Sequence, residues 1–232
     1  MLFAFDSYDG VVIKNSLLWW TYDRQKKFLH SYGAESIWEI AELLEEKYNQ
    51  DLWHRFIGLP GSVAGAVYGN AWCFGLETEN NFVSCQVLNL DTGLKQTFTK
   101  AEMLFDYRSS ILKIEKKYFL ISASFDLSKK IEKYHSETDN IDFRENKQPK
   151  WNSCWSFFKN PSRDQSAGYL IEQVGCKWAN IWGAHFSDKH ANFLIHDGTG
   201  SYKDLLELIE FVQNKVKNKF WVYLENEVQI IK

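Results

Sequence analysis

Residues 128–150 read SKKIEKYHSETDNIDFRENKQPK, a stretch that is almost entirely polar. Such a stretch has no apolar face to bury, so it forms a solvated helix, a linker, or both. The apolar residues on either side of it must then build separate cores, and 232 residues are enough for two modest domains. We expect a first domain over residues 1–127, a linker over 128–150, a second domain over 151–220 and a C-terminal strand over 221–232.

The first part of the chain mixes strands with one helix. Val11 to Lys14 is rich in β-branched residues and follows a turn, which predicts a short strand. Ser36 stands before apolar residues at helical spacing, which predicts an amphipathic helix over 36–48 with Ser36 as its N-cap. Residues 85–99 alternate on both sides of Asp91–Gly93, which predicts a hairpin. Residues 118–127 predict a further strand, with one face made of Phe119, Ile121, Ala123 and Phe125.

The second part predicts two helices and a last strand. The stripe Ala167, Leu170, Ile171 and Val174 predicts a helix that Gly175 ends. Ser201, with Asp204 three residues later, opens a second helix. Its apolar stripe is Leu205, Ile209, Val212 and Val216. Residues 222–231 predict a strand, so the whole pattern indicates an α+β fold.

Charge and apolar pattern argue against some partners. The net charge is −3, with 27 basic and 30 acidic residues, which gives no field to gather a nucleic acid. No apolar run reaches the roughly 20 residues of a membrane span, and Asp6 and Asp9 interrupt the start, where a signal peptide is apolar. We therefore expect a cytoplasmic monomer that binds neither nucleic acid nor membrane.

The cysteines and late histidines do not form an obvious metal site. No CxxC pair occurs, which favours buried or incidental thiols over disulfides or zinc. The histidine spacing fits no common ligand set, so we expect no metal. The residues concerned are Cys73, Cys85, Cys154, Cys176, His185, His190 and His196.

Residues 58–75, GLPGSVAGAVYGNAWCFG, are rich in glycine and alanine. Glycine lets backbone N–H groups approach a ligand closely and adopts positive φ, which is how loops hold phosphates. The spacing matches neither of the two common nucleotide fingerprints. A tight structural turn is therefore the alternative to a binding loop.

Four stretches resemble one family in order and spacing. They are GLPGSVAGAVYGNA, LFDYRSS (104–110), CWSFFKNP (154–161) and LENEVQII (224–231). The family is that of the UDP-N-acetylenolpyruvoylglucosamine reductases, or MurB family, which carry G-I-P-G-[ST]-x-G-G-A…N-A-G, F-x-Y-R-x-S, G-S-F-F-K-N-P and L-E-P-E-V. The stretches AGYLIEQVGCK and GAHFSDKHANFLIH are similar to its third domain. The resemblance thus covers Phe3 to Ile231.

This resemblance implies an incomplete FAD-binding domain of the vanillyl-alcohol-oxidase/PCMH type, followed by a smaller α+β substrate-binding domain. It implies that NADPH reduces FAD, and that the flavin then reduces UDP-N-acetylglucosamine enolpyruvate to UDP-N-acetylmuramate in peptidoglycan synthesis. The glycine-rich stretch would lie on the flavin. The implied FAD contacts are Gly58, Pro60, Gly61, Ser62, Val63, Gly65, Asn70 and Ala71.

The resemblance also implies three catalytic residues. Arg108 would hold the substrate carboxylate with its guanidinium fork; a surface arginine beside a tyrosine is the alternative. Ser156 would deliver a proton to C2 of the enolpyruvyl group, and a helix N-cap is its alternative or additional role. Glu227 would assist at C2; a charged residue near a frayed C-terminus is the alternative. Asn226 stands where the family has proline, a departure that could loosen the segment presenting Glu227.

Substrate contacts are implied at Tyr107, Lys159, Asn160 and His190. A cation and an amide suit a diphosphate, whereas His190 is equally compatible with a structural role. The sequence between Tyr107 and Ser156 is short for the tyrosine-bearing loop that one branch of the family folds over its substrate. The loop-lacking branch is therefore the better match.

In the family, a segment with a G-G-G-S-N turn precedes the stretch that Leu2 to Asn15 resembles, and it helps to hold the FAD diphosphate. That segment is not among the 232 residues, so we expect weak FAD binding or none. One alternative function is then a UDP-sugar-binding remnant without flavin chemistry. Another is an oxidase on the same scaffold, which Arg108, Ser156 and Glu227 disfavour.

Ten tryptophans make up about 4% of the chain, several times the usual share. Strain and overpacking at a glycine position cost roughly 1–3 kcal/mol each, so several such changes would exceed the roughly 5–15 kcal/mol that stabilises a domain. We hypothesise that UGA codons of the source encode glycine and were translated as tryptophan. Against the family pattern, glycine is expected at Trp53, Trp72, Trp155, Trp178, Trp182 and Trp221, with Trp20 and Trp151 as further candidates.

Overall fold

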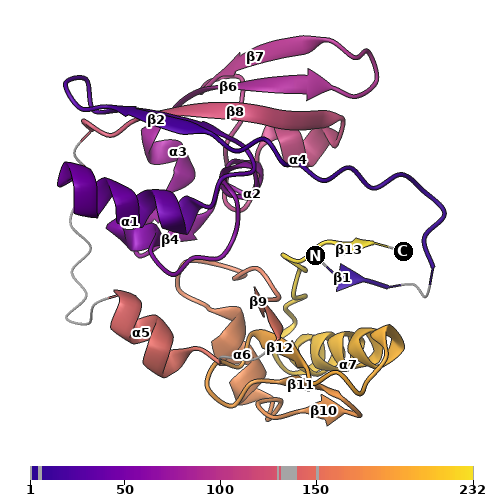
Figure 1. Ribbon diagram of the computed structural model, residues 1–232. Helices are drawn as coiled ribbons and strands as arrows, with labels where there is room; N and C mark the ends of the chain where they lie inside the picture. The colour runs from indigo at the N-terminus through magenta and orange to yellow at the C-terminus, as the bar shows by residue number, and fades with distance from the viewer. Residues whose placement is uncertain (1, 5–6, 130, 132–139, 150–151, 232) are drawn as a thin grey trace. The chain divides into compact units, whose positions relative to one another are not determined.

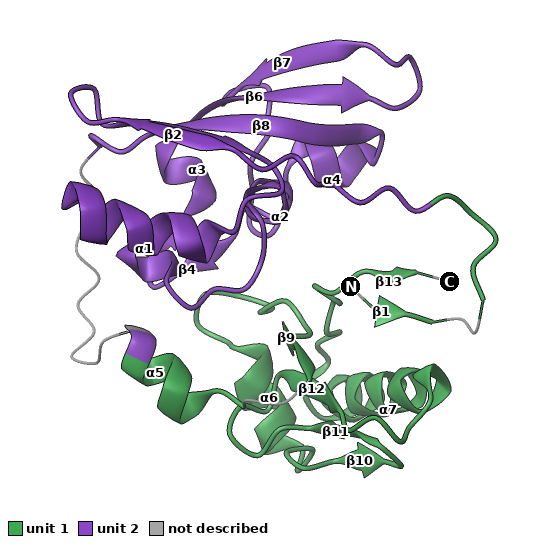
Figure 2. Ribbon diagram, viewed as in Figure 1, with its two compact units in different colours: residues 1–11, 142–232 green, residues 12–141 purple. Residues whose placement is uncertain are grey.

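The computed structural model describes residues 2–4, 7–129, 131, 140–149 and 152–231 (Figure 1). The chain divides into two compact units, one of residues 12–141 and one of residues 1–11 with 142–232 (Figure 2). The first residues, which the sequence pattern assigns to the first domain, thus cluster with the C-terminal unit. The reason is a parallel pairing of β1 (Leu2–Phe3) with β13 (Ile230–Ile231).

Unit 12–141 is built on an antiparallel five-stranded sheet whose order is β2-β3-β8-β6-β7. Figure 1 shows helices α1 to α4 against one face of this sheet. The strands are β2 (Trp20–Asp23), β3 (Phe28–Tyr32), β6 (Phe82–Asn89), β7 (Lys95–Thr99) and β8 (Tyr118–Asp126). The other elements are α1 (Ile37–Tyr48), η1 (His54–Phe56), α2 (Val63–Tyr68), β4 (Trp72–Cys73), β5 (Leu76–Glu77), α3 (Thr78–Asn81) and α4 (Ile111–Glu115).

The amphipathic helix and the hairpin of this unit are confirmed. Ser36 caps α1, because its Oγ accepts a hydrogen bond from the Glu39 N–H at 3.2 Å. Ile40 and Leu44 of this helix are fully buried in the core. β6 and β7 pair on either side of Asp91–Gly93, as the alternation predicts.

Two strand predictions for the first part of the chain are wrong. Residues 11–14 form no strand, and Val11 is 86% exposed, because a strand needs a partner to satisfy its backbone. In β8, Ile121 does not share the buried face with Ala123 and Phe125 as predicted, because the register with β6 shifts at Ile121. This β-bulge places Leu120 in the core together with Ala123 and Phe125.

The C-terminal unit holds a four-stranded antiparallel sheet with the order β10-β11-β12-β9. The helix α7 packs against β10, β11 and α6. The strands are β9 (Ser153–Ser156), β10 (Asn180–Ile181), β11 (Ala184–Phe186) and β12 (Phe193–His196). The helices are α6 (Ala167–Gln173) and α7 (Tyr202–Phe220), while α5 (Asn140–Lys147) lies in the polar stretch 128–150.

Both predicted helices of this unit are confirmed. In α7, Ser201 and Asp204 form a capping box, and Leu205, Ile209 and Val212 are buried. In α6 the predicted end is marked by Gly175, whose φ is +70°. The predicted last strand is much shorter than expected, because only Ile230–Ile231 pair as a strand. Within the described ranges, no helix has the length and apolarity to cross a membrane.

Four tryptophans have a left-handed backbone, which is unusual for a bulky residue. Among the described non-glycine residues with positive φ, tryptophan is the most frequent type, ahead of lysine and asparagine. The φ values are +65° at Trp155, +67° at Trp178, +49° at Trp182 and +59° at Trp221. By contrast, Trp53 has φ −90°, and Trp72 lies in β4. Trp151 lies outside the described residues.

Candidate active site

Ser156 is the last residue of β9, and it follows a bulge. Ser156 pairs with Phe193 and Ser153 pairs with Ile195, so β9 carries one more residue than β12 between these pairs. Trp155, with φ +65°, lies in this bulge. Bulges re-aim side chains and recur beside active sites. The alternative role of Ser156 as a helix N-cap is wrong, because no helix begins in the residues that follow it.

Glu227 lies on a segment that pairs with the residues just after Ser156. The Glu227 N–H donates to the Phe157 carbonyl at 2.8 Å, and the Lys159 N–H donates to the Glu225 carbonyl at 2.8 Å. Between these bonds, Phe158 and Asn226 form an antiparallel bridge. The backbone thus brings the positions of Ser156 and Glu227 together in one unit.

Lys159 and Asn160 are already engaged within this unit. The Lys159 Nζ forms an ion pair with the Glu225 carboxylate at 3.0 Å. The Glu225 side chain is 68% exposed and that of Lys159 is 27% exposed. The Asn160 Oδ1 accepts a hydrogen bond from the Ala167 N–H at 3.1 Å, at the start of α6. A diphosphate at Lys159 would therefore compete with an exposed carboxylate.

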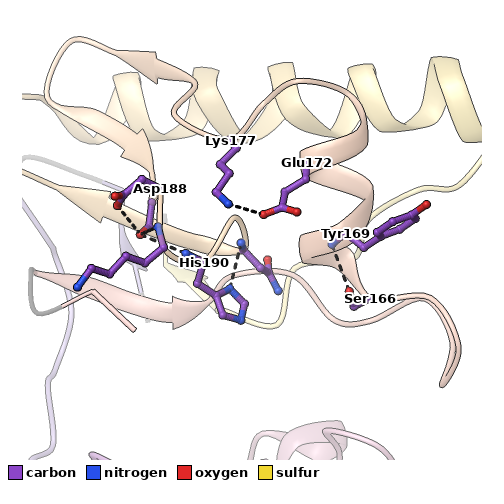
Figure 3. A network of polar contacts seen from close by, with 9 residues as sticks. Ser166, Tyr169, Glu172, Lys177, Asp188 and His190 are labelled. Atoms are coloured by element: carbon purple, nitrogen blue, oxygen red, sulfur yellow. Dashed lines mark hydrogen bonds and ion pairs between the residues drawn. The ribbon is translucent and has the colours of Figure 1, made fainter. Parts of the chain in front are cut away.

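His190 is mostly buried beside α6 (Figure 3). Its Nδ1 accepts a hydrogen bond from the Asn192 backbone N–H at 3.3 Å. The proton of the neutral ring therefore resides on Nε2. A Cβ placed on Gly168 of α6 would meet the ring at 3.7 Å, and the Phe193 ring lies 4.4 Å away. Burial lowers the pKa of His190, so the imidazole is neutral at pH 7.

The glycine-rich stretch contains the short helix α2. Ser62 caps it, because its Oγ accepts from the Gly65 N–H at 3.2 Å. Gly58 and Gly61 precede α2 with φ +80° and +139°, and no atom lies within 4 Å of a Cβ placed on Gly61. Of the other predicted FAD contacts, Pro60 precedes the helix, Val63 and Gly65 lie in it, and Asn70 and Ala71 follow it. The backbone is therefore open to an approaching group at Gly61.

Asn70 joins this stretch to the turn that carries Arg108. The Asn70 Nδ2 donates to the Asp106 carbonyl at 3.2 Å and to the Glu77 carboxylate at 2.8 Å. Asn70 is 1% exposed, and its Oδ1 accepts from the Glu79 N–H at 3.0 Å. All three hydrogen bonds of the Asn70 side chain are therefore made to other groups of the protein.

Arg108 lies in a tight turn between Asp106 and Ser109, which exchange two backbone hydrogen bonds of 3.2 and 3.0 Å. Its φ is +54°, and its guanidinium carbon lies 5.8 Å from the centroid of the Tyr107 ring. The Lys113 Nζ donates to the Arg108 carbonyl at 2.8 Å. Arg108 and Tyr107 therefore belong with the glycine-rich stretch in unit 12–141.

The candidate residues thus form two groups, one in each unit. The sequence interpretation overlooked Asn192 and Gln213, two buried amides that bond to the segments carrying Ser156 and Glu227. The signal was present in the sequence, because Asn192 stands just before the apolar run of β12 and Gln213 interrupts the apolar stripe of α7. Within the described part of the chain, no group of three or more His, Cys, Asp or Glu residues could hold a metal ion.

Comparison with known proteins identifies relatives of this chain. Residues 147–231 match the family described as UDP-N-acetylenolpyruvoylglucosamine reductase, C-terminal domain. A UDP-N-acetylenolpyruvoylglucosamine reductase of Fervidobacterium nodosum is 43% identical over 75% of this chain and 57% of its own length. The protein of the same name from Thermotoga petrophila is 40% identical over 75% of this chain and 61% of its own length. The chain therefore spans about three fifths of these two relatives.

A solved structure of such a reductase is also similar to this chain. The crystal structure of UDP-N-acetylenolpyruvylglucosamine reductase (MurB) from Thermus caldophilus matches with a TM-score of 0.70 and 26% identity. The match covers 91% of this chain and 74% of the solved chain. Both units are thus included in the similarity.

Proposed function

Because the chain belongs to the UDP-N-acetylenolpyruvoylglucosamine reductase family, we propose that it reduces UDP-N-acetylglucosamine enolpyruvate to UDP-N-acetylmuramate in the cytoplasm. The observation that supports this proposal is the backbone pairing of residues 157–159 with residues 225–228, which brings the chain positions of Ser156 and Glu227 close together within one unit. A proton donor and an assisting carboxylate at one carbon are what the proposed reaction needs.

FAD is the cofactor that we propose, held in a vanillyl-alcohol-oxidase/PCMH-type domain to which unit 12–141 contributes. Bound FAD would supply hydride transfer, taking the hydride from NADPH and passing it to the enolpyruvyl group. The residues present fit such a group, because Gly58 and Gly61 have positive φ ahead of the Ser62 cap and no atom lies within 4 Å of a Cβ placed on Gly61. Of the predicted contacts, Asn70 has its side chain committed to the protein.

The chain's own residues then act on the substrate. Arg108 binds the enolpyruvyl carboxylate with its guanidinium fork and stabilises the negative charge that develops there. Ser156 gives its hydroxyl proton to C2, and Glu227 orients the groups around that carbon. Lys159 exchanges the Glu225 carboxylate for the substrate diphosphate.

The test uses the purified protein with FAD in excess, with NADPH and UDP-N-acetylglucosamine enolpyruvate added. We expect NADPH oxidation that depends on the UDP-sugar and a product heavier by H₂ in mass spectrometry. Binding of the UDP-sugar without any NADPH oxidation overturns the proposal and supports a sugar-binding remnant.

A further inference from the structure

We infer that Asn192 and Gln213 are positioning residues, which hold the two paired segments that present Ser156 and Glu227. The inference rests on the proposed function for the roles of Ser156 and Glu227. The positioning itself rests on hydrogen bonds within the C-terminal unit.

Asn192 fixes the residues that directly follow Ser156. Its Oδ1 accepts from the Phe158 N–H at 2.9 Å, and its Nδ2 donates to the Phe158 carbonyl at 2.8 Å. Its backbone carbonyl accepts from the Phe157 N–H at 2.8 Å. A carboxamide that bonds both backbone groups of one residue copies a strand pair, and it does so just after the bulge has disturbed the β9–β12 ladder. Asn192 is 2% exposed, so water cannot replace these bonds.

Gln213 fixes the residues that directly precede Glu227. It projects from α7 and is 9% exposed. Its Nε2 donates to the Leu224 carbonyl at 2.8 Å and to the Asn226 Oδ1 at 3.2 Å. Both N–H groups of this amide are thus used on the one segment.

The hydrogen bond from Gln213 to Asn226 compensates for the asparagine that stands where the family has proline. A proline fixes its own φ, whereas an asparagine does not. Here the Asn226 side chain is tied to Gln213, and Asn226 bridges to Phe158. Gln213, Asn226, Phe158 and Asn192 therefore form one continuous polar connection between α7 and β12. A displacement at either end would reach both Ser156 and Glu227.

The test compares near-isosteric variants. Gln213→Glu and Asn192→Asp each remove amide N–H donors with little change of volume. Asn214→Asp is the matched control, because Asn214 is exposed on the same helix. Gln213→Met removes the donors without adding charge, and it replaces Gln213→Glu if that variant fails to fold.

Two readouts separate positioning from general stability. The first is the two half-reactions, where we expect the step with the UDP-sugar to slow by about 100-fold, as for a misplacement of about 1 Å. Flavin reduction by NADPH should keep its rate, because it needs neither Ser156 nor Glu227. The second is hydrogen exchange of the Glu227 amide, which should accelerate in Asn192→Asp as well as in the Gln213 variants, but not in the control.

The outcomes distinguish this inference from the proposed function. If the parent protein performs no reduction, the proposed function fails, and exchange at Glu227 still decides whether the amides hold the segment. An unchanged Glu227 exchange in all variants overturns the inference. Faster exchange with an unchanged UDP-sugar step also overturns it, because the bonds would then be structural only.

A different observation, the backbone φ, carries a second inference. We infer that residues 155, 178, 182 and 221 are glycine in the protein as its own organism makes it. Trp221 is the C-cap of α7 with φ 59° and ψ 22°, and its N–H donates to the Lys217 carbonyl at 2.9 Å. This is the left-handed position after a helix that glycine usually fills.

Trp182 and Trp155 occupy places of the same kind, and Trp178 has a φ of +67°. Trp182 is the first residue of the two-residue turn between β10 and β11, where a positive φ calls for glycine. Trp155 lies in the bulge of β9, where a positive φ is the glycine form of a bulge. Trp178, Trp182 and Trp221 are 62%, 87% and 90% exposed, so packing does not explain the indoles.

Peptide mass spectrometry of the protein isolated from its own organism tests this inference. Peptides that span the four positions should have the masses of their glycine forms. Masses that contain tryptophan at these positions overturn it. For Trp53 and Trp72 the backbone makes no such demand, so their identity follows from the same measurement.

Discussion

Restoring glycine at Trp221 should stabilise the C-terminal unit. The left-handed backbone costs a residue with a Cβ about 1–2 kcal/mol, and glycine removes that cost. Glycine loses about 0.4–1 kcal/mol through the greater freedom of the unfolded chain. The indole is 90% exposed, so almost no burial is lost, and Trp221→Gly should gain about 1 kcal/mol. For a domain of about 100 residues, this raises Tm by about 4–8 °C.

Calorimetry of the full chain measures this change as a shift of the transition that belongs to the C-terminal unit. Trp38→Gly is the matched control, because Trp38 lies within α1 and is 40% exposed. Trp38 has no left-handed backbone to relieve, so Trp38→Gly should not stabilise the protein. A Trp221→Gly protein that melts at or below the parent temperature would refute the strain argument.

Three further predictions concern single side chains. Lys159→Met should weaken UDP-sugar binding about tenfold in calorimetric titration. Glu225→Gln removes the competing carboxylate and should not weaken binding. An equal loss of affinity in both variants would contradict the role of Lys159. Burial lowers the pKa of His190, so the unfolded chain takes up its proton more readily. The free energy of unfolding should therefore fall as the pH drops below about 6.5. In urea titrations at pH 7 and pH 5, this fall should be smaller for His190→Gln than for the parent protein. An equal fall in the two proteins would refute the prediction. Burial raises the pKa of Cys154 to about 11, so iodoacetamide should label it at pH 8 far more slowly than an unfolded thiol, and equal rates would contradict its burial.

The sequence predicted the elements whose signals are local. The Ser36 cap of α1 and the capping box of Ser201 and Asp204 depend on neighbours in the chain, and both are confirmed. The face of β8 could not be predicted, because the bulge at Ile121 depends on its register with β6. The length of the last strand depends in the same way on pairing with β1.

The candidate site was predictable only in part. The resemblance named Ser156 and Glu227, and the structure joins their segments through the Phe157 carbonyl. The amides of Asn192 and Gln213 were overlooked, because a polar residue in an apolar run shows its purpose only when its partners are known. Long-range contacts, which local propensity does not encode, explain the features that the sequence did not predict.

The role of Ser156 as proton donor is tested by anaerobic stopped-flow absorbance of the FAD-loaded protein. NADPH is added first and the UDP-sugar enolpyruvate second. We expect the parent protein to lose its flavin colour with NADPH and regain it with the UDP-sugar, whereas Ser156→Ala should lose the colour normally and regain it far more slowly. If Ser156→Ala regains its colour at the parent rate, Ser156 is not the proton donor.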